Sequence, residues 1–135
     1  MSLFNVGFAI FPDLTQLDFT GPQQVLARLP DSAMHIVAKS KDPVPSDSGL
    51  SLMPTHTFEN CPDLDLICVP GGYKGVIDAL GDEETIDFVR RQASTARYVT
   101  SVCTGAFTPS PEAHDIYAHL TNSAGRRRIW VRIGS

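Results

Sequence analysis

Residues 98–107 read YVTSVCTGAF, and this stretch decides the fold. Its β-branched and apolar residues predict a buried strand over 97–102, which leads directly into Cys103. A cysteine followed by Thr104 and Gly105 is typical of a nucleophile on a sharp turn from a strand into a helix. Such a turn exposes the thiol and directs the first helical N–H groups toward the atom that the sulfur attacks.

A second strand end lies upstream, where residues 64–72 read LDLICVPGG. The apolar run predicts another buried strand, and Gly71 and Gly72 would let the backbone after it approach a ligand closely. Ligands of open parallel sheets bind beside the carboxyl ends of the strands. The two strand ends therefore predict one site at one edge of a parallel sheet, although a glycine pair alone is also typical of an ordinary tight turn.

The rest of the chain alternates between strand and helix patterns. Strands are expected at 6–11 and 34–38, a loop at 42–49, and an extended segment or small hairpin at 50–58. One helix is expected at 23–29, with Thr20 as its N-cap and Pro22 in its first turn. Another is expected to begin at the acidic residues 82–84. This order predicts an α/β sandwich around a mostly parallel sheet.

Composition limits the classes of function. The chain has 135 residues, enough for one domain, and a net charge of −4, so nucleic acid is not an expected partner. No segment is apolar for long enough to cross a membrane, and no signal peptide is recognisable. The three cysteines and four histidines lack the spacing of a metal site or a disulfide framework. We therefore expect a cytoplasmic protein without a metal, in which Cys61 and Cys68 are packing residues.

The last part of the sequence has a different character. Pro109 and Pro111 should end the helix after Cys103 near residue 107. A short helix at 112–120 and a strand with basic flanks at 126–133 are the remaining patterns. The charge also changes sign, from seven basic against 13 acidic residues in 1–108 to four against two in 109–135. We expect a domain over 1–107 followed by an atypical tail, 108–135, of the kind that a truncation or a shifted reading frame produces.

Four segments together resemble one known superfamily. They read GFAIFP at 7–12, LDFTGP at 17–22, VPGG at 69–72 and VTSVCTG at 99–105. In this combination and order they are similar to the ThiJ/PfpI superfamily, and the second and fourth are most similar to isocyanide hydratases. The resemblance covers residues 3–107 and implies a class I glutamine amidotransferase-like, flavodoxin-like three-layer sandwich that is incomplete at its C-terminal end.

The resemblance also implies an activity and its residues. Isocyanide hydratases add water to an isocyanide and give an N-substituted formamide, without a metal or organic cofactor, and they act as dimers. The family's nucleophile corresponds to Cys103 and its catalytic aspartate to Asp18. Backbone amides near the reacting centre correspond to Gly72 and Thr104. Gly71 and Thr20 would line the substrate pocket.

This chemistry suits the residue types. A thiolate is the best protein nucleophile for the soft carbon of an isocyanide, and a carboxyl group such as Asp18 can move the protons that follow. Many ThiJ/PfpI hydrolases carry His directly after the cysteine, whereas this chain has Thr104, which argues against peptidase or amidotransferase chemistry.

Other interpretations stay open at this stage. Cys103 could be a buried core residue, and Asp18 could cap a helix. The chain could instead be the ligand-sensing domain of an AraC-type transcription regulator, or an inactive remnant of a hydratase. The expected partners are a small-molecule substrate and a second copy of the chain, with no nucleic acid and no membrane.

Overall fold

A computed structural model describes residues 3–103 and 128–132. For Tyr73, Val76, Ile77, Leu80, Val102, Cys103 and residues 128–132 it describes the backbone alone. The main sheet has six strands in the order β5-β2-β1-β6-β7-β8, and every neighbouring pair is parallel. The strands are β1 Phe4–Ala9, β2 Ser32–Ala38, β5 His56–Thr57, β6 Leu66–Val69, β7 Tyr98–Cys103 and β8 Arg128–Arg132.

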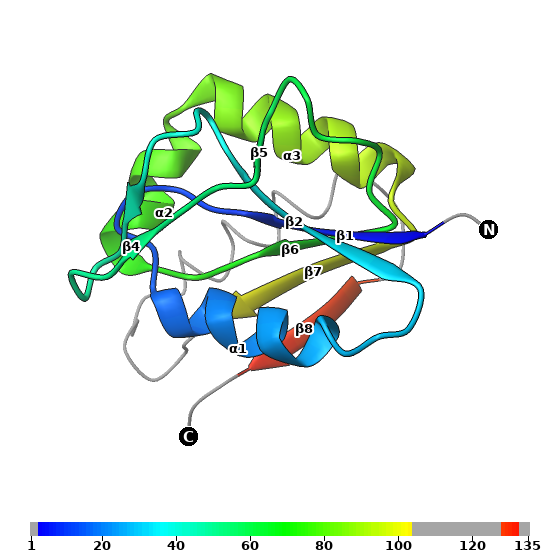
Figure 1. The fold of residues 1–135 in the computed structure, drawn as a ribbon. Helices are drawn as coiled ribbons and strands as arrows, with labels where there is room; N and C mark the ends of the chain where they lie inside the picture. Colours follow the sequence, from blue (N-terminus) through cyan, green and yellow to red (C-terminus); the bar gives the residue numbers. More distant parts are fainter. Residues whose placement is uncertain (1–2, 104–127, 133–135) are drawn as a thin grey trace.

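Helices cover both faces of this sheet, as a parallel sheet requires. Helix α1 (Gln16–Leu26) lies on one face, while α2 (Tyr73–Leu80) and α3 (Glu83–Thr95) lie together on the other (Figure 1). Apart from the short edge strand β5, the strand order is the 2-1-3-4-5 order of flavodoxin-like folds. The expected three-layer α/β fold with a parallel sheet is confirmed.

The core forms because both faces of the central strands are apolar. Strand β6 is buried at every position, and β1 is buried from Val6 onward. On the α1 face, Phe8 of β1 meets Phe19 of α1 edge to face, with ring centroids 5.3 Å apart. On the other face, Phe58 stacks on Phe88 of α3 with ring centroids 4.5 Å apart. Burial of each such ring contributes about 2–3 kcal/mol.

The prediction of a helix over 23–29 is wrong at the N-terminal end. Helix α1 begins at Gln16, its N-cap is Thr15 rather than Thr20, and Pro22 lies inside it. A proline there removes one helical hydrogen bond. The earlier start nevertheless brings Phe19 into the core, where its side chain is only 4% exposed, and this burial outweighs the lost bond.

The other expected elements agree with the structure to within a few residues. A small antiparallel pair, β3 (Val44–Pro45) with β4 (Ser51–Leu52), forms a hairpin that begins inside the expected loop at 42–49, whereas the extended segment expected at 50–58 contains β4 and β5. Helix α3 follows Asp82, as the acidic start predicted, and the tail's strand appears as β8 beside β7. Helix α2 is not among the elements that were expected from the sequence pattern. The expected turn and helices over 104–120 lie outside the described residues.

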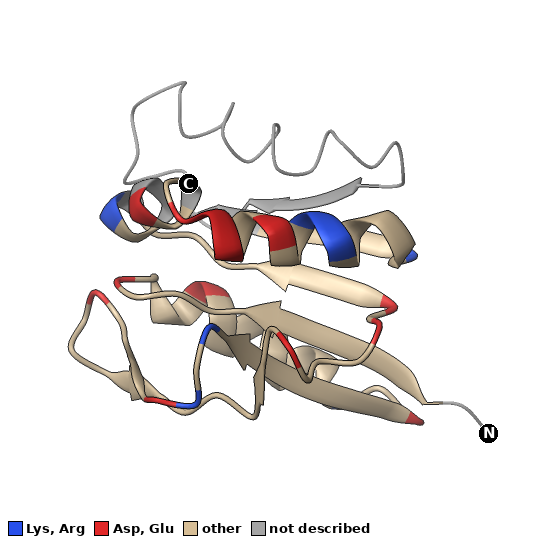
Figure 2. Ribbon diagram, turned by 90° about the horizontal axis from the view of Figure 1, so that it is seen from above, with Lys and Arg blue, Asp and Glu red and all other residues tan. Residues whose placement is uncertain are grey.

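The acidic start of α3 matches its dipole, and no basic residue lies in its last turn. Glu83, Glu84 and Asp87 occupy the first half of the helix, and Arg90 and Arg91 follow them (Figure 2). Over the part of the chain that the structure describes, no helix has the length and apolar character needed to span a bilayer.

The amino ends of the strands are joined by a polar network. The Asn5 N–H donates to Oδ2 of Asp65 over 2.8 Å, and the Asp65 N–H donates back to the Asn5 carbonyl over 2.8 Å. The N–H groups of Arg97 and Tyr98 both donate to the Asp65 carbonyl. His35 Nε2 lies 3.0 Å from Oδ1 of Asn5. Asp65 therefore connects the starts of β1, β6 and β7.

Candidate functional site

The carboxyl edge of the sheet is the place where a ligand would be expected. From β1 the chain continues through α1 to β2 on one side, whereas β6 pairs with β1 on the other side. The strand order thus reverses between β1 and β6, and flavodoxin-like folds bind ligands in the crevice at that position. The segments that follow β1 and β6 are the start of α1 and the turn at Gly71 and Gly72.

The Gly71–Gly72 turn packs directly on the start of α1. The Thr15 N–H donates to the Gly71 carbonyl over 2.9 Å. Gly72 has φ +148°, and a Cβ there would lie 3.1 Å from the Asp13 carbonyl oxygen and 3.1 Å from Cα of Leu14. A side chain at Gly72 would therefore strain the backbone and crowd the neighbouring segment. Gly72 is required by this close approach, which brings the turn and α1 together.

Asp18 lies in the first turn of α1 and has no solvent exposure. Its N–H donates to the Thr15 carbonyl over 3.0 Å, so the backbone of the first turn fixes its position. A carboxylate in a first turn is favoured by the helix dipole. Asp18 is nevertheless not the N-cap, a position that Thr15 occupies. The structure thus places a carboxyl group inside the protein, close to the carboxyl edge.

Cys68 of β6 and Thr100 of β7 lie opposite each other in the sheet. Asp18 on α1 interacts electrostatically with Cys68. Burial raises the pKa of the Cys68 thiol to about 11, the adjacent Thr100 hydroxyl opposes the shift, and the Asp18 charge adds to it. Thr100 donates its hydroxyl to the Ile67 carbonyl over 3.1 Å. Cys68 is therefore a neutral thiol near neutral pH.

The sequence did not single out this Cys68–Thr100 pair. The alternation of strand residues could have indicated it. Cys68 pairs with Phe8, and because Phe8 points toward α1, Cys68 lies on the α1 face of the sheet as well. Cys61 is a different case, since it lies near α3, accepts a weak contact from Gln92, and has its pKa raised to about 11 by burial. Neither thiol is an activated nucleophile, because the reactive species is the thiolate.

The backbone places Cys103 as the last residue of β7, paired with Arg132 of β8. Helix α1 contacts β7 as well as β1, so Asp18 and the end of β7 belong to the same side of the molecule. Thr104 lies outside the described residues. Thr20 is half-buried on α1, and its hydroxyl bonds to Oε1 of Gln16 over 3.0 Å, within the helix.

The predicted site residues that can be traced thus converge on one edge. Gly71 and Asp18 are both hydrogen-bonded to the backbone of Thr15, and the backbone of Cys103 ends at the same edge one strand away. Among the residues whose side chains are described, no three His, Cys, Asp or Glu residues gather as metal ligands would. The arrangement offers a buried acid and a cysteine position for chemistry on a small molecule.

Comparison with known proteins identifies the family. The sequence profile of the DJ-1/PfpI family matches residues 5–113. Isonitrile hydratase from Pseudomonas putida is 59% identical over 102 residues, which cover 76% of this chain and 44% of the hydratase. A ThiJ/PfpI family protein from Pseudomonas syringae has a crystal structure that aligns with a TM-score of 0.74 at 40% identity, over 78% of this chain and 44% of that protein.

A more distant structure supports the fold. A DJ-1 superfamily protein from Agrobacterium tumefaciens aligns with a TM-score of 0.67 at 15% identity, over 98% of this chain and 82% of that protein. The chain spans less than half the length of the two Pseudomonas relatives. The resemblance carried by the four sequence segments is confirmed, and the chain belongs to the DJ-1/PfpI family.

Proposed function

We propose that this chain is an isonitrile hydratase-like protein that adds water to an isocyanide at the carboxyl edge of its sheet. The observation that carries the proposal is the fully buried Asp18 beside the Gly71–Gly72 turn, at the edge where β7 ends in Cys103. The 59% identity to the Pseudomonas putida enzyme supports the choice of substrate class. The substrate of the whole protein would be a small isocyanide, handled in the cytoplasm without a metal or cofactor.

The proposed reaction has two stages. The Cys103 sulfur attacks the terminal carbon of R–N≡C, and the thiol proton, carried by Asp18, is delivered to that carbon to give the thioimidate R–N=CH–S–Cys103. Water then adds its oxygen to the same carbon and a proton to the nitrogen. Collapse of this adduct expels the Cys103 sulfur, which recovers its proton, and releases the formamide R–NH–CHO.

Each remaining predicted residue has a role in this scheme. The backbone N–H groups of Gly72 and Thr104 would stabilise the polar adduct, as preorganised amides do in acyl transfer. Gly71 and Thr20 would line the pocket for the R group. Cys68 would take no covalent part, because its thiol is neutral near pH 7.

We also propose that the chain works as a homodimer through the outer face of α1. Leu17 is 55% exposed and Val25 is 71% exposed, although both are large and apolar. They are separated by eight residues, with Gly21 between them, so they lie along one side of the helix. Sedimentation equilibrium tests this proposal, since Val25→Glu should yield a monomer where the wild type forms a dimer.

The test of the function is turnover of phenyl isocyanide to N-phenylformamide by the 135-residue chain. Cys103→Ala should abolish product formation, while Cys61→Ala, the matched control at a half-buried cysteine away from this edge, should retain it. Circular dichroism of each sample reports folding. A folded wild-type chain without turnover would refute the hydratase proposal and favour a ligand-sensing domain; an unfolded one would identify an inactive remnant.

A further inference from the structure

A second concave site lies on the opposite face of the sheet. A cavity of about 480 Å³ opens at the carboxyl ends of β1 and β2, on the side that α2 and α3 cover. This volume is within the usual range of small-molecule sites. Its lining comes from residues 10–12, 38–40 and 42–45, from Phe58, from α2, and from Asp82 and Thr85 at the start of α3.

This cavity is separate from the Asp18 site. No residue of α1 lines it, and the lining includes Pro12, which with Asp13 belongs to the backbone that connects β1 to α1. That backbone is packed tightly on α2, because a Cβ on Gly75 would lie 2.6 Å from the carbonyl oxygens of both residues. A ligand in the cavity would therefore contact α2 and α3 rather than α1, the helix that holds Asp18.

The inner walls of the cavity are apolar and fixed. Ile10, Phe11, Ala38 and Val44 are buried in the core, and each is at most 7% exposed. Phe58 is held in place by its stacking on Phe88. Walls of this kind fit an aromatic ring or a branched aliphatic group, whose burial supplies most of the binding free energy.

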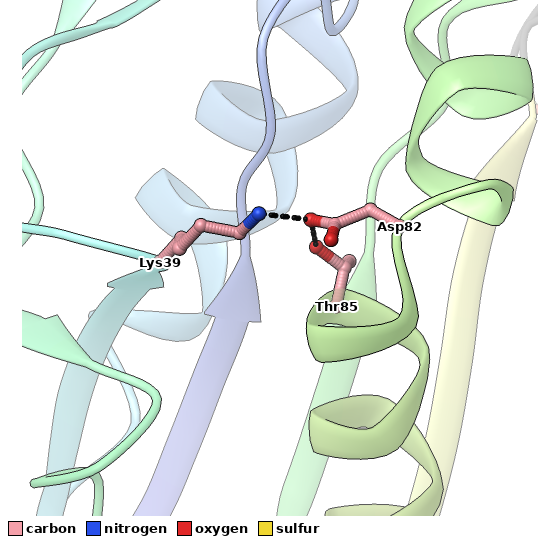
Figure 3. Close-up of polar contacts among 3 residues, drawn as sticks. All are labelled: Lys39, Asp82 and Thr85. Carbon is pink, nitrogen blue, oxygen red and sulfur yellow. Dashed lines mark hydrogen bonds and ion pairs between the residues drawn. The ribbon is translucent and has the colours of Figure 1, made fainter.

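The mouth of the cavity carries charge. Lys39 Nζ lies 2.8 Å from Oδ2 of Asp82, and the Thr85 hydroxyl donates to the same oxygen over 2.7 Å (Figure 3). The hydrogen bond between Lys39 and Asp82 raises the pKa of Lys39 and lowers the pKa of Asp82. Both groups are therefore charged at neutral pH. Lys39 and Asp82 thus neutralise each other.

Two further carboxylates remain at this mouth. Oδ2 of Asp78 lies 3.7 Å from Nζ of Lys74, and Oδ2 of Asp13 lies 3.6 Å from the same nitrogen. Asp42 accepts a hydrogen bond from the Ser40 hydroxyl over 3.3 Å and forms no ion pair within the described part of the chain. Asp82 is paired with Lys39 and Asp78 with Lys74, so Asp42 is the carboxylate of the lining that no ammonium group in the described part of the chain neutralises, and its charge favours a cationic ligand over an anionic one.

We propose that this cavity binds a small primary amine with an aromatic body, of the arylalkylamine class. The ring occupies the apolar pocket between Phe11 and Phe58, and the ammonium group lies at the mouth near Asp42. This is a binding site additional to the proposed hydratase site, and it needs neither Cys103 nor Asp18.

The test uses 2-phenylethylamine as the probe and isothermal titration calorimetry on the 135-residue chain. We expect a Kd on the order of 1 mM for a ligand of this size. The matched anion 3-phenylpropionate should bind at least tenfold more weakly. Ala79→Phe, which fills the cavity, should reduce amine affinity more than tenfold, and Asp42→Asn should reduce it about threefold because the charge is at the surface.

Controls separate this site from the rest of the protein. Asp63→Asn, an exposed carboxylate away from the cavity, and Cys103→Ala should both leave amine binding unchanged. Equal affinity for 3-phenylpropionate, or loss of amine binding in Cys103→Ala, would overturn the proposal. Should Ala79→Phe fail to fold by circular dichroism, amide chemical-shift changes on amine addition must map to residues 38–45 and 75–85, and changes centred elsewhere would overturn it.

Discussion

The two ends of the parallel sheet use aspartate in opposite ways. At the amino end, Asp65 accepts the Asn5 N–H on its side chain and two further N–H groups on its carbonyl, and so connects three strands. At the carboxyl end, Asp18 is fully buried beside a glycine turn and a strand that ends in cysteine. The amino end of the sheet is therefore held together by its aspartate, whereas the carboxyl end carries the residues of the proposed site.

The largest difference between the two ends is expected when each carboxylate is exchanged for an amide. Asp18→Asn should lower isocyanide turnover by more than about 100-fold, because an amide cannot move protons. Asp65→Asn should keep the turnover of the folded fraction. Equal turnover in the two variants, measured by product formation, would contradict the division of roles.

Adding a methyl group tests how closely the carboxyl end is packed. Gly75→Ala should destabilise the fold by about 3 kcal/mol, because the new Cβ would meet two backbone carbonyl oxygens that cannot move easily. Gly7→Ala is the matched control. Its Cβ would meet the Leu64 side chain, which can shift, so the cost should be about 1 kcal/mol. Urea denaturation measures both, and the reverse order would show that α2 can move away from residues 12–13.

Removing the cross-strand carboxylate sharpens the role of the amino end. Asp65→Ala should lower the free energy of unfolding by about 2 kcal/mol, because the Asn5 N–H loses its charged acceptor. Asp63→Ala, two residues earlier and exposed, should change it by less than about 0.5 kcal/mol. Chemical denaturation of both variants provides the comparison. Similar losses in the two would mean that the network contributes little.

The smallest expected effect is a pH dependence at the amino end. Burial, and to a smaller extent the nearby His56, lower the pKa of His35. The unfolded chain then binds a proton at this position more readily than the folded one, so His35 favours folding above its usual pKa of 6.5 and loses this effect as pH falls below it. The melting temperature should fall less between pH 7.5 and pH 5.5 in His35→Gln than in the wild type.

The sequence predicted the sheet well because its strands are continuous apolar runs, which local patterning identifies. It failed where distant residues decide the structure. The start of α1 is set by Phe19 packing on Phe8, and no local signal outweighs Pro22. Helix α2 follows two glycines and contains Gly75, a poor helix former that is required by contact with residues 12–13.

In the candidate site, too, local motifs were predictable from the sequence, whereas contacts between distant segments were not. Gly71, Gly72 and Asp18 were found through short motifs, and their proximity follows from the parallel topology. The Cys68–Thr100 pair and the cavity beside Lys39 and Asp82 are assembled from segments far apart in the chain. Such contacts depend on register and side-chain direction, which periodicity alone does not fix.

The central position of β1 has a consequence for synthesis on the ribosome. One edge of β1 pairs with β2 and the other pairs with β6. The partner of the Asn5 N–H, Asp65, is synthesised 60 residues after Asn5. At about 5–20 residues per second, this leaves the inner edge of β1 open for roughly 3–12 s while the nascent chain grows. During that interval Val6 and Phe8 present an unpaired apolar strand, which is the form that chaperones protect and that aggregation captures.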